Sequence, residues 1–274
     1  MTVINTNMSA MRAANASNAA AQILGTAMQR LSTGKRINAA KDDAAGLAIS
    51  TSMTSQINGM NQGIRNANDG ISLAQTAEGA LNEVTNMLQR VRELAVQSAS
   101  GTYQAVDRTN MQQEVDALQA QVDSVLTNTA FNGVALFSQT AGTDITFDIQ
   151  AGANASDVIT VTSVAIDGTN IAPAALKVDT AANATLTLGF VDAALTDVAA
   201  TNAAFGGGES QLQSAINNLT SNSTNLSDAR SRIMDADYSA ETTQMAKAQI
   251  LSQASTAMIA QANQAQQNVL SLLK

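Results

Sequence analysis

The last 66 residues, 209–274, contain no glycine and no proline, and the first 33 residues contain a single glycine, Gly25. Glycine and proline are the residues that most often interrupt a helix. In both segments apolar residues recur at intervals of three or four, which is the spacing of one helix face. We therefore expect long amphipathic helices at both ends of the chain, although chain ends are usually the most dispensable parts of a domain.

Small side chains must build most of the core. Hydrophobic residues account for 45% of the 274 residues, but only 3% are aromatic and tryptophan is absent. Ala, Leu, Val, Ile and Met are left to fill the interior. Small side chains let helices approach closely, yet each buries little area, so long interfaces must supply the stabilisation. The length allows one or two domains.

Apolar stripes define the two terminal helices, and Gly34 is well placed to end the first one in the left-handed conformation. The N-terminal stripe comprises Ile4, Met8, Met11, Ala14, Ala21, Leu24, Met28 and Leu31. The C-terminal stripe comprises Ala248, Leu251, Ala254, Met258, Ala262, Ala265, Val269 and Leu272. Isolated helices are marginal in water, so we expect each to pair with the other and with further copies of the chain.

Two internal segments carry the spacing of a coiled-coil seam. Apolar residues repeat every three or four positions over 73–95, and those over 111–125 alternate steps of four and three. Gly101 lies between the two segments. A short turn that joins two such helices favours an antiparallel pair.

Glycines predict interruptions elsewhere. The stretch 35–70 carries Gly46, Gly59, Gly63 and Gly70, so we expect a short helix at 44–58 followed by a connector. Near the end of the chain, helix is expected at 191–204, a pause at 206–208, and helix again from Glu209.

Residues 134–190 differ from the rest of the chain. Asn132-Gly133, just before them, is a strong hairpin signal. The segments with alternating or β-branched residues are 145–149, 158–161 and 185–188. The whole chain therefore predicts a mainly α fold with a small β-rich insert. It would have long terminal coiled-coil helices, an antiparallel helical bundle as its body, and an outward β-hairpin region.

Charge is distributed unevenly. Residues 1–41 hold five basic residues and no acid, 42–227 hold five basic and 18 acidic residues, and 228–274 hold four of each. A basic segment can bind nucleic acid or a membrane. These five charges are spread out, however, and no aromatic residues interleave them. We therefore favour an acidic protein surface as the partner, either on another protein or on another copy of the chain.

Catalysis is disfavoured because histidine and cysteine are both absent. The commonest general base, the commonest metal ligand and all thiol chemistry are thereby excluded. Asp42-Asp43 and the pair Asp235 and Asp237 lack the further ligands that a metal site needs. We interpret them as turn and helix-capping acids, and we expect no enzyme and no cofactor.

The start of the chain lacks the charged and apolar regions of a secretory signal peptide. No run of 18 apolar residues occurs, so no membrane insertion is expected. If the protein leaves the cell, it uses a route that needs no such signal.

Several runs match a known family. In the first half they are INTNMSA at 4–10, RLSTGKRIN at 30–38, KDDAAGLAI at 41–49, LQRVRELAVQ at 88–97 and FNG at 131–133. In the second half they are ARSRI at 229–233, DADY at 235–238, KAQIL at 247–251 and QQNVLSLL at 266–273. These runs resemble bacterial flagellin over about 1–140 and 210–274, in the same order. Residues 141–205 do not match strongly.

The resemblance implies a structural subunit that self-assembles through paired terminal helices into a hollow filament for swimming motility. Residues 1–43 and 235–274 would be the terminal arms that line a central channel. Residues 44–140 and 190–234 would form the bundle body, and 141–189 its variable outer part. The Gln- and Asn-rich faces of the last helix would then border a wet channel; by themselves they equally suit a solvated coiled coil. The arm residues expected in self-assembly are Ile4, Met8, Met11, Leu24, Met28, Leu31, Leu251, Met258, Val269, Leu272 and Leu273.

The resemblance also implies partners. The chain would be secreted through the flagellar type III pathway with an export chaperone, and it would assemble beneath a cap protein next to hook–filament junction proteins. A Toll-like receptor of a host would contact the monomer. The residues expected at that contact are Gln89, Arg90, Leu94 and Glu114. The simpler interpretation of 88–97 is a core helix with exposed charges, and both can hold.

Three alternatives remain. A hook–filament junction protein shares terminal helices with flagellins, although the match over 88–97 and over the last nine residues favours the filament subunit. An enzyme with a protease insert would need an H-E-x-x-H motif, which a chain without histidine cannot have. A chemoreceptor-like signalling coiled coil is disfavoured by the β insert and the basic N-terminal arm.

Overall fold

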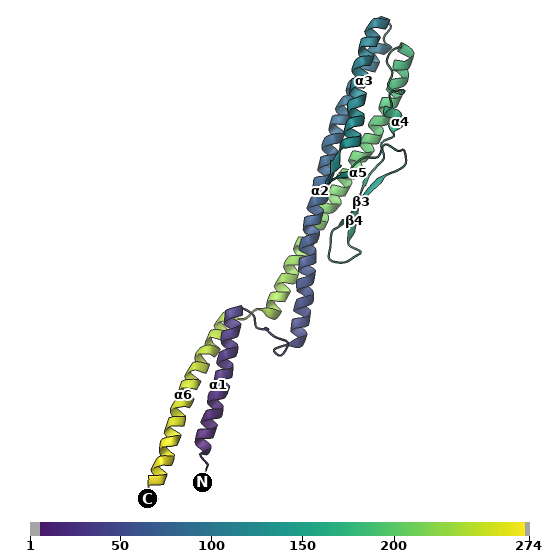
Figure 1. Cartoon of the computed structure of the whole chain (residues 1–274). Helices are drawn as coiled ribbons and strands as arrows, with labels where there is room; N and C mark the ends of the chain where they lie inside the picture. The colour runs from purple at the N-terminus through teal and green to yellow at the C-terminus, as the bar shows by residue number, and fades with distance from the viewer. Residues whose placement is uncertain (1–5, 272–274) are drawn as a thin grey trace. The chain divides into compact units, whose positions relative to one another are not determined.

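The computed structural model describes residues 6–271, with side chains described as far as Gln267. These residues form six helices and four short strands (Figure 1). In chain order they are α1 (Met8–Thr33), α2 (Ala44–Ala99), α3 (Ala105–Asn128), β1 (Ala130–Phe131), β2 (Val134–Ala135), β3 (Ile145–Gln150), β4 (Val158–Ser163), α4 (Gly168–Ile171), α5 (Ala181–Met234) and α6 (Tyr238–Ser271). The predicted mainly α fold with a small β insert is confirmed.

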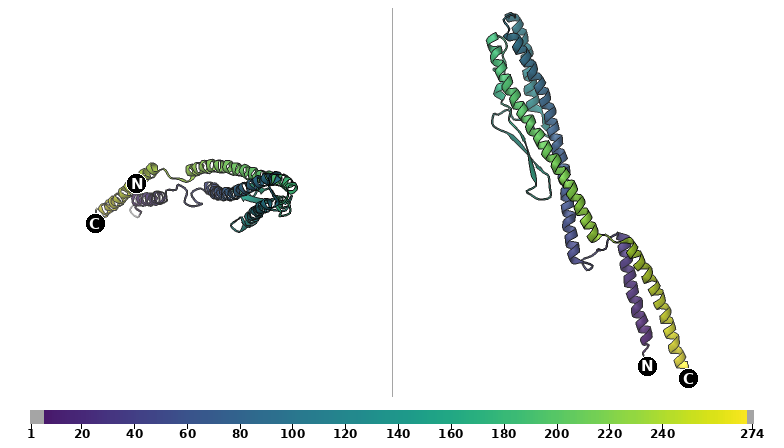
Figure 2. Two further views of the ribbon diagram at one scale, coloured as in Figure 1. Left: turned by 90° about the horizontal axis from the view of Figure 1, so that it is seen from above. Right: turned by 180° about the vertical axis from the view of Figure 1, so that it is seen from behind.

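The chain divides into two compact units. The first contains residues 1–55 and 225–274, and the second contains residues 56–224. In the first unit α1 and α6 lie side by side (Figures 1 and 2). The two helices run antiparallel. One hydrogen bond joins the start of α1 to the end of α6, and another joins the end of α1 to the start of α6. The terminal helices therefore pair with each other, as predicted.

In the second unit α2, α3 and α5 form a helical bundle (Figures 1 and 2). The predicted seams make its core. Leu81 and Leu88 of α2, Val115 and Val122 of α3, and Phe205 of α5 are all fully buried. Four of these five residues are aliphatic and only Phe205 is aromatic, so the core depends on the length of the helix interfaces more than on bulky side chains, as the composition indicated.

Two antiparallel hairpins lie between α3 and α5. In the longer one β3 pairs with β4, and Phe147 stands opposite Val161. In the shorter one β1 and β2 flank Asn132 and Gly133, whose φ angles are 50° and 81°. Positive φ at both central residues defines the turn that Asn-Gly favours, so the predicted hairpin signal is confirmed.

The prediction of a connector after residue 58 is wrong, because α2 continues without a break to Ala99. The glycines that suggested it are packing positions. A β carbon at Gly59 would lie 2.7 Å from Cβ of Ala153, and one at Gly63 would lie 2.8 Å from the carbonyl of Ala151. Glycine is needed where the backbone after β3 passes against α2, and this tertiary contact outweighs its weak helix propensity.

The strand expected at 185–188 and the pause expected at 206–208 are also wrong, because α5 runs unbroken from Ala181 to Met234. A β carbon at Gly208 would lie 3.0 Å from either γ carbon of Val161. The absence of a side chain at Gly208 therefore lets β4 pack closely against α5. Residues 185–188 are helical although they are rich in β-branched residues, because the buried positions around them recur at helical spacing and β propensity depends on context. The buried positions are 184, 187, 191, 194 and 198.

The segment between β4 and α5 is mostly irregular. Side chains of α3 and α5 donate hydrogen bonds to its backbone carbonyls. Gln119 of α3 donates from Nε2 to the carbonyl of Ile171 at 3.0 Å. Thr187 of α5 donates to the carbonyls of Ala175 and Lys177 at 3.1 and 2.6 Å. Buried backbone carbonyls need such partners, so these side chains hold the segment on the bundle.

Candidate functional site

The terminal helices meet through small side chains. Four small residues are buried, with exposed fractions of no more than 8%: Ala20 and Ala27 of α1, and Ala248 and Ser255 of α6. Such residues let two helix backbones approach closely, but they remove little apolar area from water. The α1–α6 seam is therefore close but contributes little stability. The predicted stripes included Ala248 but missed Ala20, Ala27 and Ser255, because sequence reasoning favoured the larger apolar residues. The available signal was the spacing of small residues: positions 17, 20 and 27 are three and seven apart, and positions 248, 252 and 255 are four and three apart.

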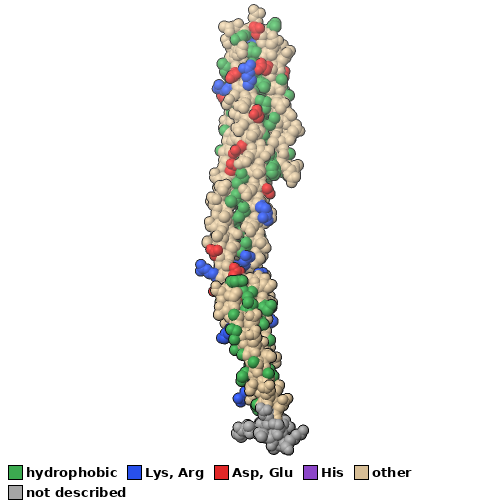
Figure 3. All heavy atoms as spheres, turned by 90° about the vertical axis from the view of Figure 1, so that its left-hand side faces the viewer, with side chains coloured by type: hydrophobic (Ala, Val, Ile, Leu, Met, Phe, Trp, Pro, Cys, Tyr) green, Lys and Arg blue, Asp and Glu red, His purple; other side chains and the backbone are tan. Residues whose placement is uncertain are grey.

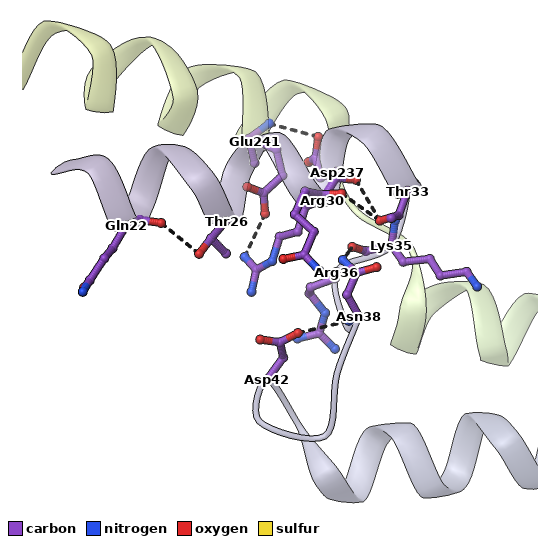
Figure 4. A network of polar contacts seen from close by, with 12 residues as sticks. Gln22, Thr26, Arg30, Thr33, Lys35, Arg36, Asn38, Asp42, Asp237 and Glu241 are labelled. Carbon is purple, nitrogen blue, oxygen red and sulfur yellow. Dashed lines mark hydrogen bonds and ion pairs between the residues drawn. The ribbon is translucent and has the colours of Figure 1, made fainter. Parts of the chain in front are cut away.

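Polar contacts fix the two ends of this pair. Asn7 caps α1 by accepting a bond from the backbone N–H of Ala10 at 3.0 Å, and its Nδ2 donates to the carbonyl of Ala262 at 3.1 Å. At the other end, Arg30 Nη1 lies 2.9 Å from Glu241 Oε1 (Figure 4). Arg30 is in the last turn of α1 and Glu241 is in the first turn of α6. These are the helix ends at which a cation and an anion are favoured.

The segments that follow α1 and precede α6 are bonded to each other. Gly34 ends α1 with a φ of 68°, as predicted. Its carbonyl accepts from the N–H of Ala236 at 3.0 Å, and the N–H of Arg36 donates to the carbonyl of Met234 at 2.6 Å. The Arg36 guanidinium donates to the carbonyl of Ile233 at 2.7 Å. The junction between the helices is thus held by backbone geometry as well as by side chains.

The paired acids act mainly as caps (Figure 4). Asp42 accepts two backbone N–H bonds at 3.0 and 3.1 Å, and these bonds lower the pKa of its carboxyl. Asp43 accepts from the N–H of Gly46 at 2.8 Å at the start of α2, and Asp237 accepts two N–H bonds at the start of α6. The capping interpretation is confirmed for these three. Asp235 instead accepts a hydroxyl bond from one turn earlier in α5 at 2.6 Å.

The larger apolar side chains of the terminal helices are exposed, and Figure 3 shows hydrophobic side chains at the surface of this unit. On α1, Met8, Met11 and Met28 are 48%, 55% and 55% exposed. On α6, Leu251 and Met258 are 44% and 61% exposed. These five are among the eleven residues expected in self-assembly, and they lie outside the seam of the single chain.

The other six residues expected in self-assembly differ. Leu24 and Leu31 are half-buried beside the seam. Ile4, Leu272 and Leu273 lie outside the described residues, and so does the side chain of Val269. The polar positions of α6 are mostly exposed: Gln261, Asn263, Gln264 and Gln267.

The residues expected to contact a receptor lie on α2 and α3. Arg90 Nε bonds Glu114 Oε1 at 2.9 Å, and Arg90 Nη1 bonds Glu93 Oε2 at 2.9 Å. These bonds raise the pKa of the Arg90 guanidinium. Gln89 is exposed, so three of the four predicted residues are accessible to solvent. Leu94 is only 2% exposed and belongs to the bundle core, so its side chain is not available to a partner in this structure.

A partly buried carboxyl between α2 and α5 was not predicted. Burial, together with the nearby carboxylate of Glu78, raises the pKa of Glu209. The Oε1 atom of Glu209 and the Oδ1 atom of Asn202 are buried without a hydrogen-bond partner. The spacing of the sequence gives no signal for this, because α5 was not expected to be continuous there.

Comparison with known proteins places these features in context. Residues 4–142 match the bacterial flagellin N-terminal helical region, and residues 188–273 match the C-terminal helical region. The chain is 38% identical to flagellin FlaB1 of Treponema pallidum over 99% of its own length and 100% of the relative's. It is 40% identical to flagellin of Bacillus subtilis, covering 99% of each chain. The crystal structure of Bacillus cereus flagellin superposes with a TM-score of 0.48 at 30% identity, covering 61% of this chain and 94% of that one.

Proposed function

This chain belongs to the bacterial flagellin family and is a structural subunit of the flagellar filament, and we propose that it assembles through the exposed apolar residues of its paired terminal helices. Flagellins are structural proteins rather than enzymes, and they polymerise with themselves into an extracellular filament. Within the described residues, none of the helices has the length and apolar character needed to cross a membrane.

One observation supports this assembly route above the others. The seam between α1 and α6 uses alanine and serine, while Met11, Met28, Leu251 and Met258 remain between 44% and 61% exposed. These residues lie on two helices that pair with each other, and apolar surface that a single chain leaves exposed commonly marks a protein interface. Every copy of the chain carries the same surface, and a contact that does not close into a ring produces a helical filament. The occupant we propose is therefore the terminal helix pair of neighbouring copies.

Charge supports contact between unlike parts of neighbouring copies. The first unit carries nine basic and six acidic residues, whereas the second carries five basic and sixteen acidic residues. Opposite net charges attract and help fix the orientation of two partners. This refines the expectation that the basic N-terminal arm meets an acidic protein surface.

We also propose the accessory steps that family membership suggests. The chain would be exported unfolded through the flagellar type III pathway, with a chaperone on the C-terminal helix. It would then be added beneath a cap protein, beyond the hook–filament junction proteins. The exposed apolar residues of α6 would suit a chaperone contact, because an unassembled apolar helix needs a temporary partner.

Truncation tests the two-arm assembly. Deletion of residues 1–35 or of residues 240–274 should leave a soluble, helical body that does not polymerise. Seeded polymerisation would be followed by sedimentation and electron microscopy, with circular dichroism as the control for folding. Normal filaments from either truncated chain would refute the proposal.

A finer test uses two exposed positions on one helix. Met258→Ser should raise the critical concentration for polymerisation about tenfold, since a buried methionine contributes roughly 1.5–3 kcal/mol. Gln261→Ala, at another exposed position of α6, is the matched control. Equal effects of the two substitutions would show that apolar burial at this position does not drive assembly.

A further inference from the structure

Four methionine side chains of the terminal helices are open to solvent. Met8, Met11 and Met28 of α1 and Met258 of α6 are 48%, 55%, 55% and 61% exposed. Every other methionine within residues 6–271 is half-buried or buried, and Met111 in the bundle is 8% exposed. The exposed thioethers therefore coincide with the surface proposed for assembly.

These sulfur atoms are the most readily oxidised groups of the chain, which has no cysteine, tryptophan or histidine. Hydrogen peroxide transfers one oxygen atom to a thioether, so that the O–O bond breaks, a sulfoxide forms and water is released. The sulfur is oxidised and the peroxide is reduced. The product side chain is polar and accepts hydrogen bonds, whereas the thioether is apolar.

We propose that Met8, Met11, Met28 and Met258 form an oxidation-sensitive switch that controls polymerisation. A subunit with sulfoxides at these positions does not enter the filament, because an interface of apolar side chains offers the sulfoxide oxygen no hydrogen bond. Methionine sulfoxide reductases restore assembly by reducing each sulfoxide to the thioether with two electrons and two protons from a dithiol, which becomes a disulfide while the oxygen leaves as water. In the filament the same side chains are covered and are protected from oxidation. The inference rests on the proposed assembly through these helices.

The experiment treats full-length monomers with hydrogen peroxide, removes the peroxide with catalase, and maps each sulfoxide by peptide mass spectrometry. Seeded polymerisation is then measured by sedimentation. We expect the critical concentration to rise about tenfold or more, with recovery after treatment with both reductases that act on the two sulfoxide epimers. Filaments treated with the same peroxide should carry less sulfoxide at the four positions than monomers do.

Two variants assign the effect to these residues. The chain with Met8→Leu, Met11→Leu, Met28→Leu and Met258→Leu should polymerise before and after peroxide. The matched control with Met53→Leu, Met60→Leu, Met87→Leu and Met111→Leu should still lose assembly and regain it with the reductases. If the first variant does not polymerise at all, recovery of the oxidised natural chain by the reductases decides the question.

The outcomes separate two failures. Normal polymerisation of monomers that carry sulfoxide at all four positions would overturn the switch and leave the assembly proposal standing. Failure of the untreated chain to polymerise on seeds would overturn the assembly proposal, and the switch with it. Continued inactivation of the first variant by peroxide would place the sensitive group elsewhere.

Discussion

The guanidinium of Arg30 and the carboxylate of Glu241 are 2.9 Å apart, and they join the last turn of α1 to the first turn of α6. The two side chains are 30% and 12% exposed, so the pair is better shielded from water than the ion pairs on the bundle surface. A partly buried pair at favourable helix ends should couple more strongly than an exposed one.

We therefore predict that Arg30→Ala and Glu241→Ala each destabilise the filament, and that the double variant loses less than the sum. A coupling free energy of about 1 kcal/mol is expected from a double-mutant cycle on critical concentrations. Arg12→Ala, exposed on the same helix, is the control. A coupling energy near zero would mean that the contact is incidental.

Glycines of α2 make a second prediction. A β carbon at Gly63 would lie 2.8 Å from the carbonyl of Ala151, whereas one at Gly79 would meet nothing within 4 Å. Gly63→Ala should destabilise the body by roughly 1–3 kcal/mol through overpacking. Gly79→Ala should stabilise it by about 0.5–1 kcal/mol, since alanine is the better helix former. Urea unfolding followed by circular dichroism measures both, and equal signs would contradict the close approach.

The raised pKa of Glu209 makes a pH prediction. Because the folded pKa lies above the ordinary value of 4.5, the protonated carboxyl favours the folded state. This contribution is complete below the unfolded pKa and is lost as the pH rises through the folded pKa. Glu209→Gln is neutral at every pH, so its stability relative to the natural chain should increase from about pH 4 to pH 7.

Unfolding free energies at a series of pH values check this expectation. Glu83→Gln, at an exposed position of α2, is the control for removing one negative charge. Parallel pH profiles for Glu209→Gln and Glu83→Gln would show that burial beside Glu78 does not set the behaviour of Glu209.

The expected recognition of the monomer by a Toll-like receptor, which the family resemblance suggested, gives a fourth prediction. If the surface of Gln89, Arg90 and Glu114 is the contact, Arg90→Ala with Glu114→Ala should weaken binding to the Toll-like receptor about tenfold or more. Arg65→Ala, elsewhere on α2, is the control. Normal signalling by the double variant would count against the contact. In the filament the same surface should be a subunit contact, so recognition should favour the monomer.

Leu94 requires a separate expectation because it is buried in the bundle. Leu94→Ala should lower the free energy of unfolding by about 2–5 kcal/mol through a cavity in the core. A loss of receptor binding by this variant would therefore need a stability measurement beside it, and unchanged stability would contradict the packing seen here.

Local signals predicted the elements that depend on local chemistry. The Asn132-Gly133 turn, the Gly34 helix end and the seams over 73–95 and 111–125 follow from turn conformation and apolar spacing. Gly63 and Gly208 were misinterpreted as breaks, because the strand or loop that packs on each of them is distant in sequence. No local property of a glycine reveals whether another backbone will pass over it.

The terminal helices show a different limit. The predicted stripe of α6 includes both Ala248 and Met258, whereas the single chain buries Ala248 together with Ser255 and leaves Met258 exposed. A stripe shows which residues avoid water, but not which of several partners covers them. In the assembly that we propose, the larger exposed residues contact neighbouring copies, so one stripe serves two interfaces and its hydrophobicity does not mark the division between them.

That division leads to the last prediction, which concerns the free monomer. The α1–α6 seam buries Ala20, Ala27, Ala248 and Ser255, whose small side chains contribute little burial, and isolated helices are marginal in water. In dilute monomer the backbone amides of α1 and α6 should therefore exchange rapidly with solvent, while those of α3, around the fully buried Val115, remain protected. In the filament, neighbouring copies should protect both terminal helices. Hydrogen–deuterium exchange with mass spectrometry measures all three segments in one sample, so α3 serves as the internal control. Strong protection of α1 and α6 in dilute monomer would mean that the seam is stable alone, and the larger exposed residues would then lose their proposed part in ordering the helices on assembly.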